Sequence, residues 1–216
     1  LASVQDNHAR FRHLMFRACT MSYFVICPMM IGLVVVAKPL VQTLLTDKWI
    51  GCVPYLQIYC FVYLLRPLAA TNLQALYALG KSDIVLKLDV VKKIVGIVLL
   101  TFVVVVFDSV MAICAILVVS ACLETMLNMT MVSKQVGYKI SQQVKSVLGI
   151  TAAAVVMGVG CYVIGRILHG ASPLVTLLVQ ISVGVVLYCL ACMFFRLQAF
   201  QYAVDYVKSW IKGRKS

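Results

Sequence analysis

Apolar runs long enough to cross a lipid bilayer recur along this chain, and they constrain its fold more than any other feature. Hydrophobic residues make up 63% of the 216 residues and charged residues 12%, against roughly 25% charged residues in a soluble domain. A bilayer core about 30 Å thick is crossed by a helix of about 20 apolar residues. Because lipid cannot pair backbone polar groups, the sequence predicts an all-α integral membrane protein.

The apolar runs predict six transmembrane helices between two polar ends. They cover residues 18–37, 52–79, 92–107, 109–133, 147–165 and 173–195. We expect Lys92 and Lys93 to snorkel from the end of the third span, and residues 83–91 to extend its helix beyond the membrane. Residues 1–17 are polar, and we interpret them as a cytoplasmic loop that links the six-helix region, residues 18–195, to an earlier part of a longer protein. In residues 196–216, apolar positions recur every three or four residues among basic ones. This pattern predicts a cytoplasmic, amphipathic, basic helix on the membrane surface.

Basic residues are distributed unevenly between the two sides of the predicted membrane region. Fifteen of the 19 Lys and Arg residues lie on the side of the two chain ends, three lie on the opposite side, and Arg66 lies within a span. This bias orients both ends to the cytoplasm. The excess of basic residues on this side also accounts for the net charge of +12. Because the basic residues lie between spans and form no separate basic domain, we expect no nucleic-acid partner.

Arg66 is the single charge in the run of residues 49–80. Insertion scales put an arginine at a helix centre at about 2.5–3.5 kcal/mol, and the side chain cannot lose its proton. Arg66 therefore faces a polar cavity and an anionic substrate, pairs with a carboxylate, or snorkels to water or backbone carbonyls. Its fork of donors suits a phosphate especially well.

Glu124 is the single acid in the predicted fourth span. Helical rise places both Arg66 and Glu124 roughly 21–23 Å from the outer ends of their spans, in the inner half of the bilayer. The equal depth allows a direct or water-mediated pair, and Glu124 has a rival role as a proton or cation site of a coupled transporter. Asn72 and Gln74 follow on the second span, either as substrate contacts or as interhelical hydrogen-bond partners.

We expect no enzyme, cofactor or metal site. The three histidines lie outside or at the edges of the spans, and no glycine-rich phosphate loop or acidic metal-nucleotide pair is present. Cys189 and Cys192 have CxxC spacing, but no further ligand lies nearby in the sequence. The nine cysteines are interpreted as small, reduced hydrophobic residues within spans.

Several segments resemble one family of membrane transporters. They are residues 3–6 (SVQD) with Arg10 and Arg12, 44–49 (LLTDKW), 54–58 (PYLQI), 66–68 (RPL) and 72–83 (NLQALYALGKSD). Over residues 1–95 the chain resembles the C-terminal half of Wzx-like polysaccharide flippases, which take part in lipopolysaccharide biosynthesis. These flippases belong to the multidrug/oligosaccharidyl-lipid/polysaccharide exporter superfamily. The resemblance implies about 12 to 14 helices in two lobes around a central cavity.

The resemblance also implies a function. Such proteins move undecaprenyl-pyrophosphate-linked oligosaccharide repeat units across the bacterial inner membrane by alternating access, for O-antigen, capsule or exopolysaccharide. Arg66, Asn72 and Gln74 would contact the substrate, and Glu124 would be a coupling or structural partner. The implied partners are the lipid-linked oligosaccharide, membrane lipids, a polysaccharide polymerase and a chain-length regulator.

Two other functions compete with the flippase. A multidrug or small-molecule cation-coupled antiporter of the same superfamily would need several acids in its cavity, whereas this chain has one buried acid and one buried arginine by sequence. A membrane scaffold or assembly factor would not need the embedded Arg66.

Overall fold

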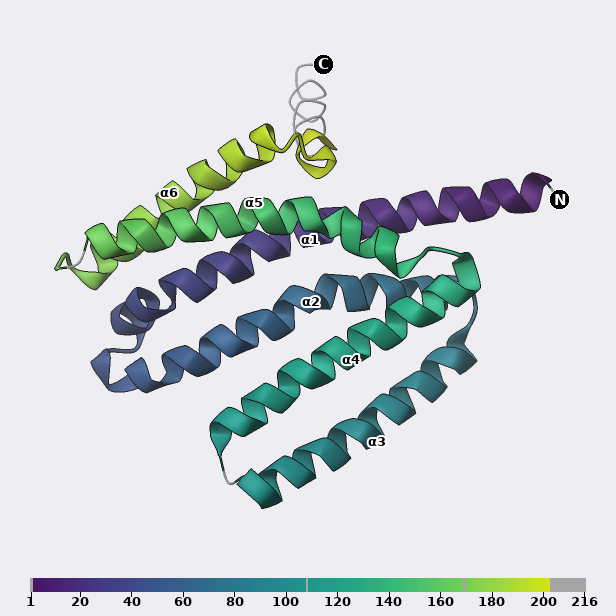
Figure 1. Ribbon diagram of the computed structural model, residues 1–216, viewed down its shortest axis with the longest axis horizontal. Helices are drawn as coiled ribbons and strands as arrows, with labels where there is room; N and C mark the ends of the chain where they lie inside the picture. Colours follow the sequence, from purple (N-terminus) through teal and green to yellow (C-terminus); the bar gives the residue numbers. More distant parts are fainter. Residues whose placement is uncertain (1, 108, 169, 203–216) are drawn as a thin grey trace, which may run out of the picture. The chain divides into compact units, whose positions relative to one another are not determined.

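The computed structural model describes residues 2–107, 109–168 and 170–202, with side chains from residue 10 onward, and no strand occurs in these ranges (Figure 1). The elements are α1 (Ala2–Leu44), η1 (a 3-10 helix, Asp47–Cys52), α2 (Val53–Ala78), α3 (Ser82–Phe107), α4 (Val110–Val136), α5 (Ile140–Ile167) and α6 (Pro173–Phe194). Each of the six α-helices includes a segment long and apolar enough to cross a membrane. The predicted all-α membrane protein with six spans is confirmed.

The first helix is longer than the sequence predicts. Residues 1–17 were expected to form a loop, but α1 begins at Ala2 and continues through Pro28 and Pro39 to Leu44. The prediction of a loop was wrong because polarity indicates water around a segment and does not prevent helix formation. Residues 2–17 contain neither Pro nor Gly, the two residues that most strongly oppose a helix.

The third helix and the C-terminal tail can also be compared with the bounds predicted from the sequence. Residues 83–91 were expected to extend the third span, and α3 runs unbroken from Ser82 to Phe107. After α6, residues 198–202 are helical. The rest of the predicted amphipathic tail lies outside the described residues.

The chain divides into two compact units. Unit 1 comprises residues 1–19 and 51–144, and unit 2 comprises residues 20–50 and 145–216. The boundaries fall within the continuous helices α1 and α5 and within η1. Each unit is therefore made of segments that are distant in the sequence.

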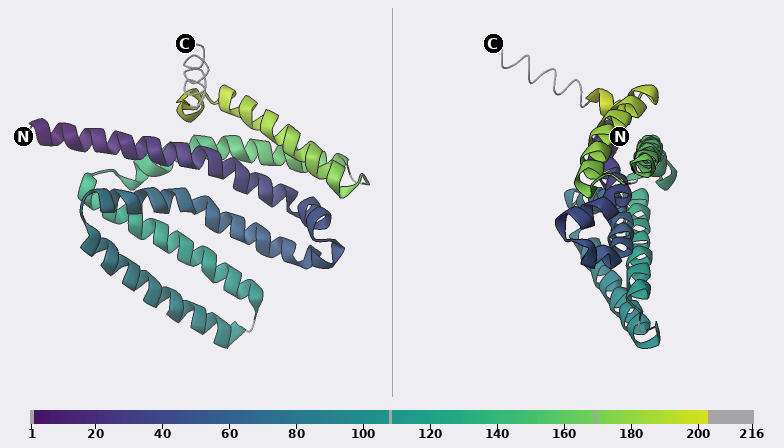
Figure 2. Two further views of the ribbon diagram at one scale, coloured as in Figure 1. Left: turned by 180° about the vertical axis from the view of Figure 1, so that it is seen from behind. Right: turned by 90° about the vertical axis from the view of Figure 1, so that its left-hand side faces the viewer.

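In unit 1, helix α4 lies between α2 and α3 and contacts both of them (Figure 1, and from behind in Figure 2). Short connections make α3 antiparallel to α2 and to α4, so α2 and α4 run in the same direction. The buried core lies where α2 and α4 end and α3 begins, and it includes one residue of α1. Its buried members are Met15, Ala75, Leu76, Val85, Leu88, Val132, Val136 and Tyr138.

In contrast, the C-terminal half of α3 exposes most of its apolar side chains. Ile97 and Val105 are among the most exposed, at 65% and 77%. A surface of this kind is stable against lipid hydrocarbon and unstable against water. The C-terminal half of α3, which lies away from the core of unit 1, therefore presents a surface suited to contact with lipid.

Unit 2 is held together by close approach of α5 to its neighbours. A Cβ atom on Gly158 would lie 2.8 Å from Ile31 Cγ2 of α1, and one on Gly160 would collide with Leu187 of α6. Small residues thus allow this helix to pack closely on its neighbours. Gln180 of α6 contacts α5 directly, because its Nε2 atom donates to the Cys161 carbonyl oxygen at 3.0 Å.

Candidate functional site

Arg66 on α2 and Glu124 on α4 lie together within unit 1. Arg66 Nη1 is 3.8 Å from Glu124 Oε2, and the two side chains are 59% and 34% exposed. Their equal depth in parallel helices explains this proximity. The distance exceeds the about 2.7–2.9 Å of a charge-assisted hydrogen bond, so the two groups attract each other without forming one.

A second cation, Lys92 of α3, lies on the other side of the same carboxylate. Its Nζ atom is 3.8 Å from Glu124 Oε1 and 2.7 Å from Asp89 Oδ1. Lys92 was predicted to snorkel out of the third span, but its side chain is only 13% exposed. The prediction was wrong because α4 packs against α3 and supplies Glu124 and Asn128 as partners for Lys92.

The sequence carries a signal that could have identified Lys92. Counted by helical rise from Phe107, where α3 ends, Lys92 lies about 22 Å along the helix. Arg66 and Glu124 lie about 20–21 Å from Val53 and Val110, where α2 and α4 begin on the same side. Three charges at one depth in three consecutive spans indicate a common site.

Asn128 of α4 connects this group of charges to the backbone of α2. Lys92 Nζ donates to Asn128 Oδ1 at 3.3 Å, and Asn128 Nδ2 donates to the Ala69 carbonyl oxygen at 3.3 Å. Asn128 is completely buried. It therefore fixes Lys92 relative to α2, a role that no sequence pattern indicated.

We call this group of five residues the charged cluster: Arg66, Asp89, Lys92, Glu124 and Asn128. Its two cations balance its two carboxylates, which lowers the free energy of placing these charges in a membrane span. The cations differ in how they are held. Lys92 has three partners, whereas Arg66 has only its ion pair with Glu124 and donates no hydrogen bond within the described part of the chain.

Asn72 lies apart from the charged cluster, in the buried end of unit 1. It is 1% exposed, and its Nδ2 atom donates to the Leu68 carbonyl oxygen and to Gln143 Oε1, both at 2.8 Å. Gln143 lies in the first turn of α5 and donates in turn to the Tyr138 carbonyl oxygen at 3.0 Å. This geometry is that of an interhelical hydrogen bond, one of the two roles considered for Asn72.

Gln74 is not brought to the charged cluster either. Its side chain is exposed, whereas Asn72 two residues earlier is buried, because neighbouring positions on a helix point in different directions. The structure thus assembles Arg66 and Glu124 and leaves Asn72 and Gln74 elsewhere on α2.

Metal ligands do not gather in the described ranges. No group of three or more His, Cys, Asp or Glu side chains has the geometry to hold a metal ion there. The nine cysteines are free thiols, with Cys192 buried and Cys189 exposed.

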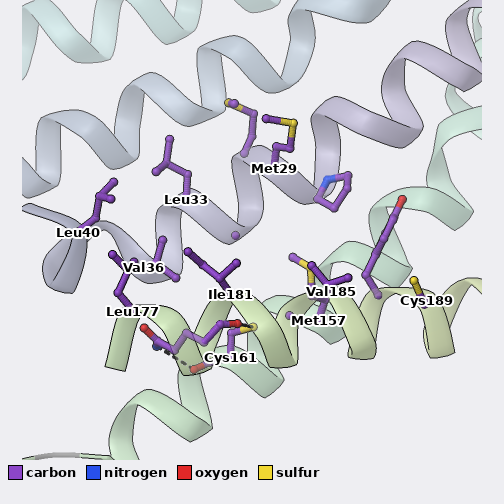
Figure 3. Close-up of a pocket in the computed structure, with 16 residues that line it drawn as sticks. Met29, Leu33, Val36, Leu40, Met157, Cys161, Leu177, Ile181, Val185 and Cys189 are labelled. Carbon is purple, nitrogen blue, oxygen red and sulfur yellow. Dashed lines mark hydrogen bonds between the residues drawn. The ribbon is translucent and has the colours of Figure 1, made fainter. Parts of the chain in front are cut away.

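Unit 2 contains a pocket of about 480 Å³ that is lined by residues of α1, α5 and α6 (Figure 3). Leu33 and Val36 of α1 lie across from Leu177 and Ile181 of α6. None of the lining residues carries a formal charge. Such walls suit hydrocarbon and offer a phosphate no counter-charge, so the charged cluster is the candidate site for an anion.

Comparison with known proteins supports the resemblance seen in the sequence. Residues 1–54 match a family model described as "Polysaccharide biosynthesis protein". The chain is 29% identical over 102 residues to an "Uncharacterized membrane protein in cps region" of Klebsiella pneumoniae. It is 30% identical over 91 residues to the "Lipopolysaccharide biosynthesis protein WzxC" of Escherichia coli K12. The chain is similar to proteins of polysaccharide biosynthesis.

These matches cover part of each protein. The two alignments span 47% and 42% of this chain, and 21% and 18% of the two relatives. No solved structure matches the chain significantly. The similarity to Wzx-like polysaccharide exporters therefore extends over a portion of the chain, and the whole proteins are much longer than the aligned parts.

Proposed function

We propose that this chain is part of a flippase that moves undecaprenyl-pyrophosphate-linked oligosaccharide repeat units across the bacterial inner membrane. The observation that carries the proposal is Arg66: a guanidinium within a span, half exposed, with no hydrogen bond to the described residues. Arginine presents five donors in a planar fork that matches phosphate oxygens. The similarity to polysaccharide biosynthesis proteins supplies the class of substrate.

The transport step itself explains why the site needs cations and no reactive groups. A flippase moves a charged head group past the hydrocarbon while the lipid tail remains in it, and it breaks no covalent bond. Alternating access of two lobes around a polar cavity achieves this. The protein therefore acts as a transporter and not as an enzyme, with Arg66 as the contact for the pyrophosphate.

The predicted orientation gives the charged cluster a place along the transport path. With both ends of the chain cytoplasmic, the cluster lies about 20–22 Å from the outer ends of α2, α3 and α4, in the inner half of the bilayer. A substrate arriving from the inner leaflet would meet these cations first. In this arrangement residues 1–17 connect to the other lobe, and residues 196–216 lie on the cytoplasmic surface.

Balanced charges favour the flippase over the cation-coupled antiporter. Both carboxylates of the charged cluster, Asp89 and Glu124, lie within 4 Å of Lys92, so a coupling cation would have to compete with that ammonium. Arg66 has only Glu124 as a counter-charge, and it shares that carboxylate with Lys92. Arg66 is therefore the group of the cluster that is best able to bind a further ion, and that ion must be an anion.

The test is replacement of Arg66 by alanine in the gene that carries this chain. We expect Arg66→Ala to abolish surface polysaccharide while the protein reaches the membrane at normal levels. Arg166→Ala is the matched control because Arg166 is exposed in the last turn of α5, outside the charged cluster. Electrophoresis of surface polysaccharide and immunoblots of membrane fractions provide the readouts. Normal polysaccharide in the Arg66→Ala strain would contradict the substrate contact.

A further inference from the structure

We infer that Arg66 and Lys92 together form an anion site that the Glu124 carboxylate occupies in this structure, and that the substrate diphosphate binds by displacing Glu124. The inference rests on the proposed function for the identity of the diphosphate. It adds a second cation and an internal competitor to that function. Each part follows from the geometry of the charged cluster.

Glu124 is placed as a bound anion would be. One of its oxygens, Oε2, faces Arg66 and the other, Oε1, faces Lys92, each at 3.8 Å. A phosphate with two oxygens directed to two cations would make the same pair of contacts. Since charge-assisted hydrogen bonds are about 2.7–2.9 Å long, neither cation is hydrogen-bonded to Glu124, and an anion that reaches closer can replace it.

Lys92 would remain in position after Glu124 leaves. Lys92 is anchored independently, through Asp89 at 2.7 Å and Asn128 at 3.3 Å. Arg66 makes no hydrogen bond within the described residues that a ligand would have to break. Lys92 is therefore held by contacts in which Glu124 has no part, and a ligand of Arg66 has only the ion pair with Glu124 to replace.

The charge of the cluster explains why an internal competitor is useful. With Glu124 in place the cluster is neutral, which stabilises it in a span when no substrate is bound. With Glu124 displaced, the cluster retains two cations and one acid, Asp89, which pairs with Lys92, and the site carries one surplus positive charge. The site is thus neutral and stable when Glu124 occupies it, and positively charged when Glu124 has moved away and an anion can bind.

The experiment measures inorganic pyrophosphate binding to the purified protein in lipid nanodiscs by calorimetry. We expect Glu124→Gln to bind pyrophosphate on the order of tenfold more tightly, because two partly exposed ion pairs no longer compete. Arg66→Ala and Lys92→Met should weaken binding by a similar factor, and Lys92→Arg should restore it. Asp83→Asn is the matched control, since it removes one exposed acid of the same helix bundle outside the cluster, and it should leave affinity unchanged.

A purely structural ion-pair network predicts no gain in affinity when Glu124 is replaced. If Glu124→Gln binds pyrophosphate no more tightly than the unmodified protein, the inference is overturned. The melting temperature of each variant shows that it is folded. Tighter binding in Glu124→Gln with no dependence of surface polysaccharide on Arg66 would support the anion site and contradict the flippase. If surface polysaccharide depends on Arg66 but Glu124→Gln does not bind pyrophosphate more tightly, the flippase is supported and the anion site is contradicted.

Discussion

Lys92 Nζ on α3 lies 3.8 Å from Glu124 Oε1 on α4, and the opposite oxygen of Glu124 lies 3.8 Å from Arg66 on α2. One carboxylate thus joins three helices of unit 1. Asn128 adds a neutral link from the same lysine to the backbone of α2. The arrangement makes the three helices depend on each other through polar contacts, away from the apolar core formed around Leu76 and Val132.

Lys92 is predicted to stabilise unit 1. Lys92→Met removes the donor to the fully buried Asn128 Oδ1, and leaving a buried acceptor unsatisfied costs about 1–3 kcal/mol. We expect a loss of that size in the free energy of unfolding, measured by denaturant titration in detergent micelles. Lys93→Met is the control, because Lys93 is the next residue but is exposed, and it should change stability by less than about 0.5 kcal/mol. Equal effects of the two variants would refute a stabilising role for Lys92.

Asn72 and Gln143 are predicted to be energetically coupled. Asn72 donates to Gln143 at 2.8 Å between two helices, and such bonds in membrane proteins contribute about 0.6 kcal/mol on average and up to about 1.7. A double-mutant cycle of Asn72→Ala and Gln143→Ala should give a coupling energy in this range. No coupling, together with loss of polysaccharide export in Asn72→Ala, would instead assign Asn72 to the substrate.

Gly158 is predicted to be required for the packing of α5 on α1. The Cβ of Gly158→Ala would lie 2.8 Å from Ile31, a β-branched side chain with little freedom to move. Overpacking of this kind costs about 1–3 kcal/mol. At Gly96 of α3 a Cβ meets open space, so Gly96→Ala should stabilise the helix by up to about 1 kcal/mol. Thermal unfolding of the two variants gives the difference, and equal melting temperatures would rule out the close approach.

Gly80 is predicted to matter for the turn between α2 and α3. Its φ angle is +69°, and the amide of the next residue, Lys81, donates to the Leu76 carbonyl oxygen at 3.0 Å as in a Schellman motif. Gly80→Ala should destabilise unit 1 by about 1–2 kcal/mol, because the left-handed region disfavours a Cβ. Gly51→Ala serves for comparison, since Gly51 has open space around it and no positive φ. A Gly80→Ala variant as stable as Gly51→Ala would argue against strain at this turn.

Within unit 1, the sequence identified two of the charges that meet and missed two. Arg66 and Glu124 stood out because each is alone in an apolar run, and helical rise gave them a common depth. Lys92 was assigned to the end of the third span and Asp89 to the stretch before it, because the uncharged run begins only at Ile94. That α3 continues through them as one helix was expected, but the burial of Lys92 depends on where α4 packs.

The sequence by itself determined that the chain is helical and built for a membrane, since apolar runs of this length leave the backbone no other way to pair its polar groups. It also determined the number of spans, their order and the matching positions of Arg66 and Glu124 along their helices, because distance along a helix follows from residue count alone. Only the tertiary structure decided which charges face each other. Rotation of one helix against another sets whether Lys92 meets Glu124 or lipid, and that rotation follows from the packing of α4 between α2 and α3.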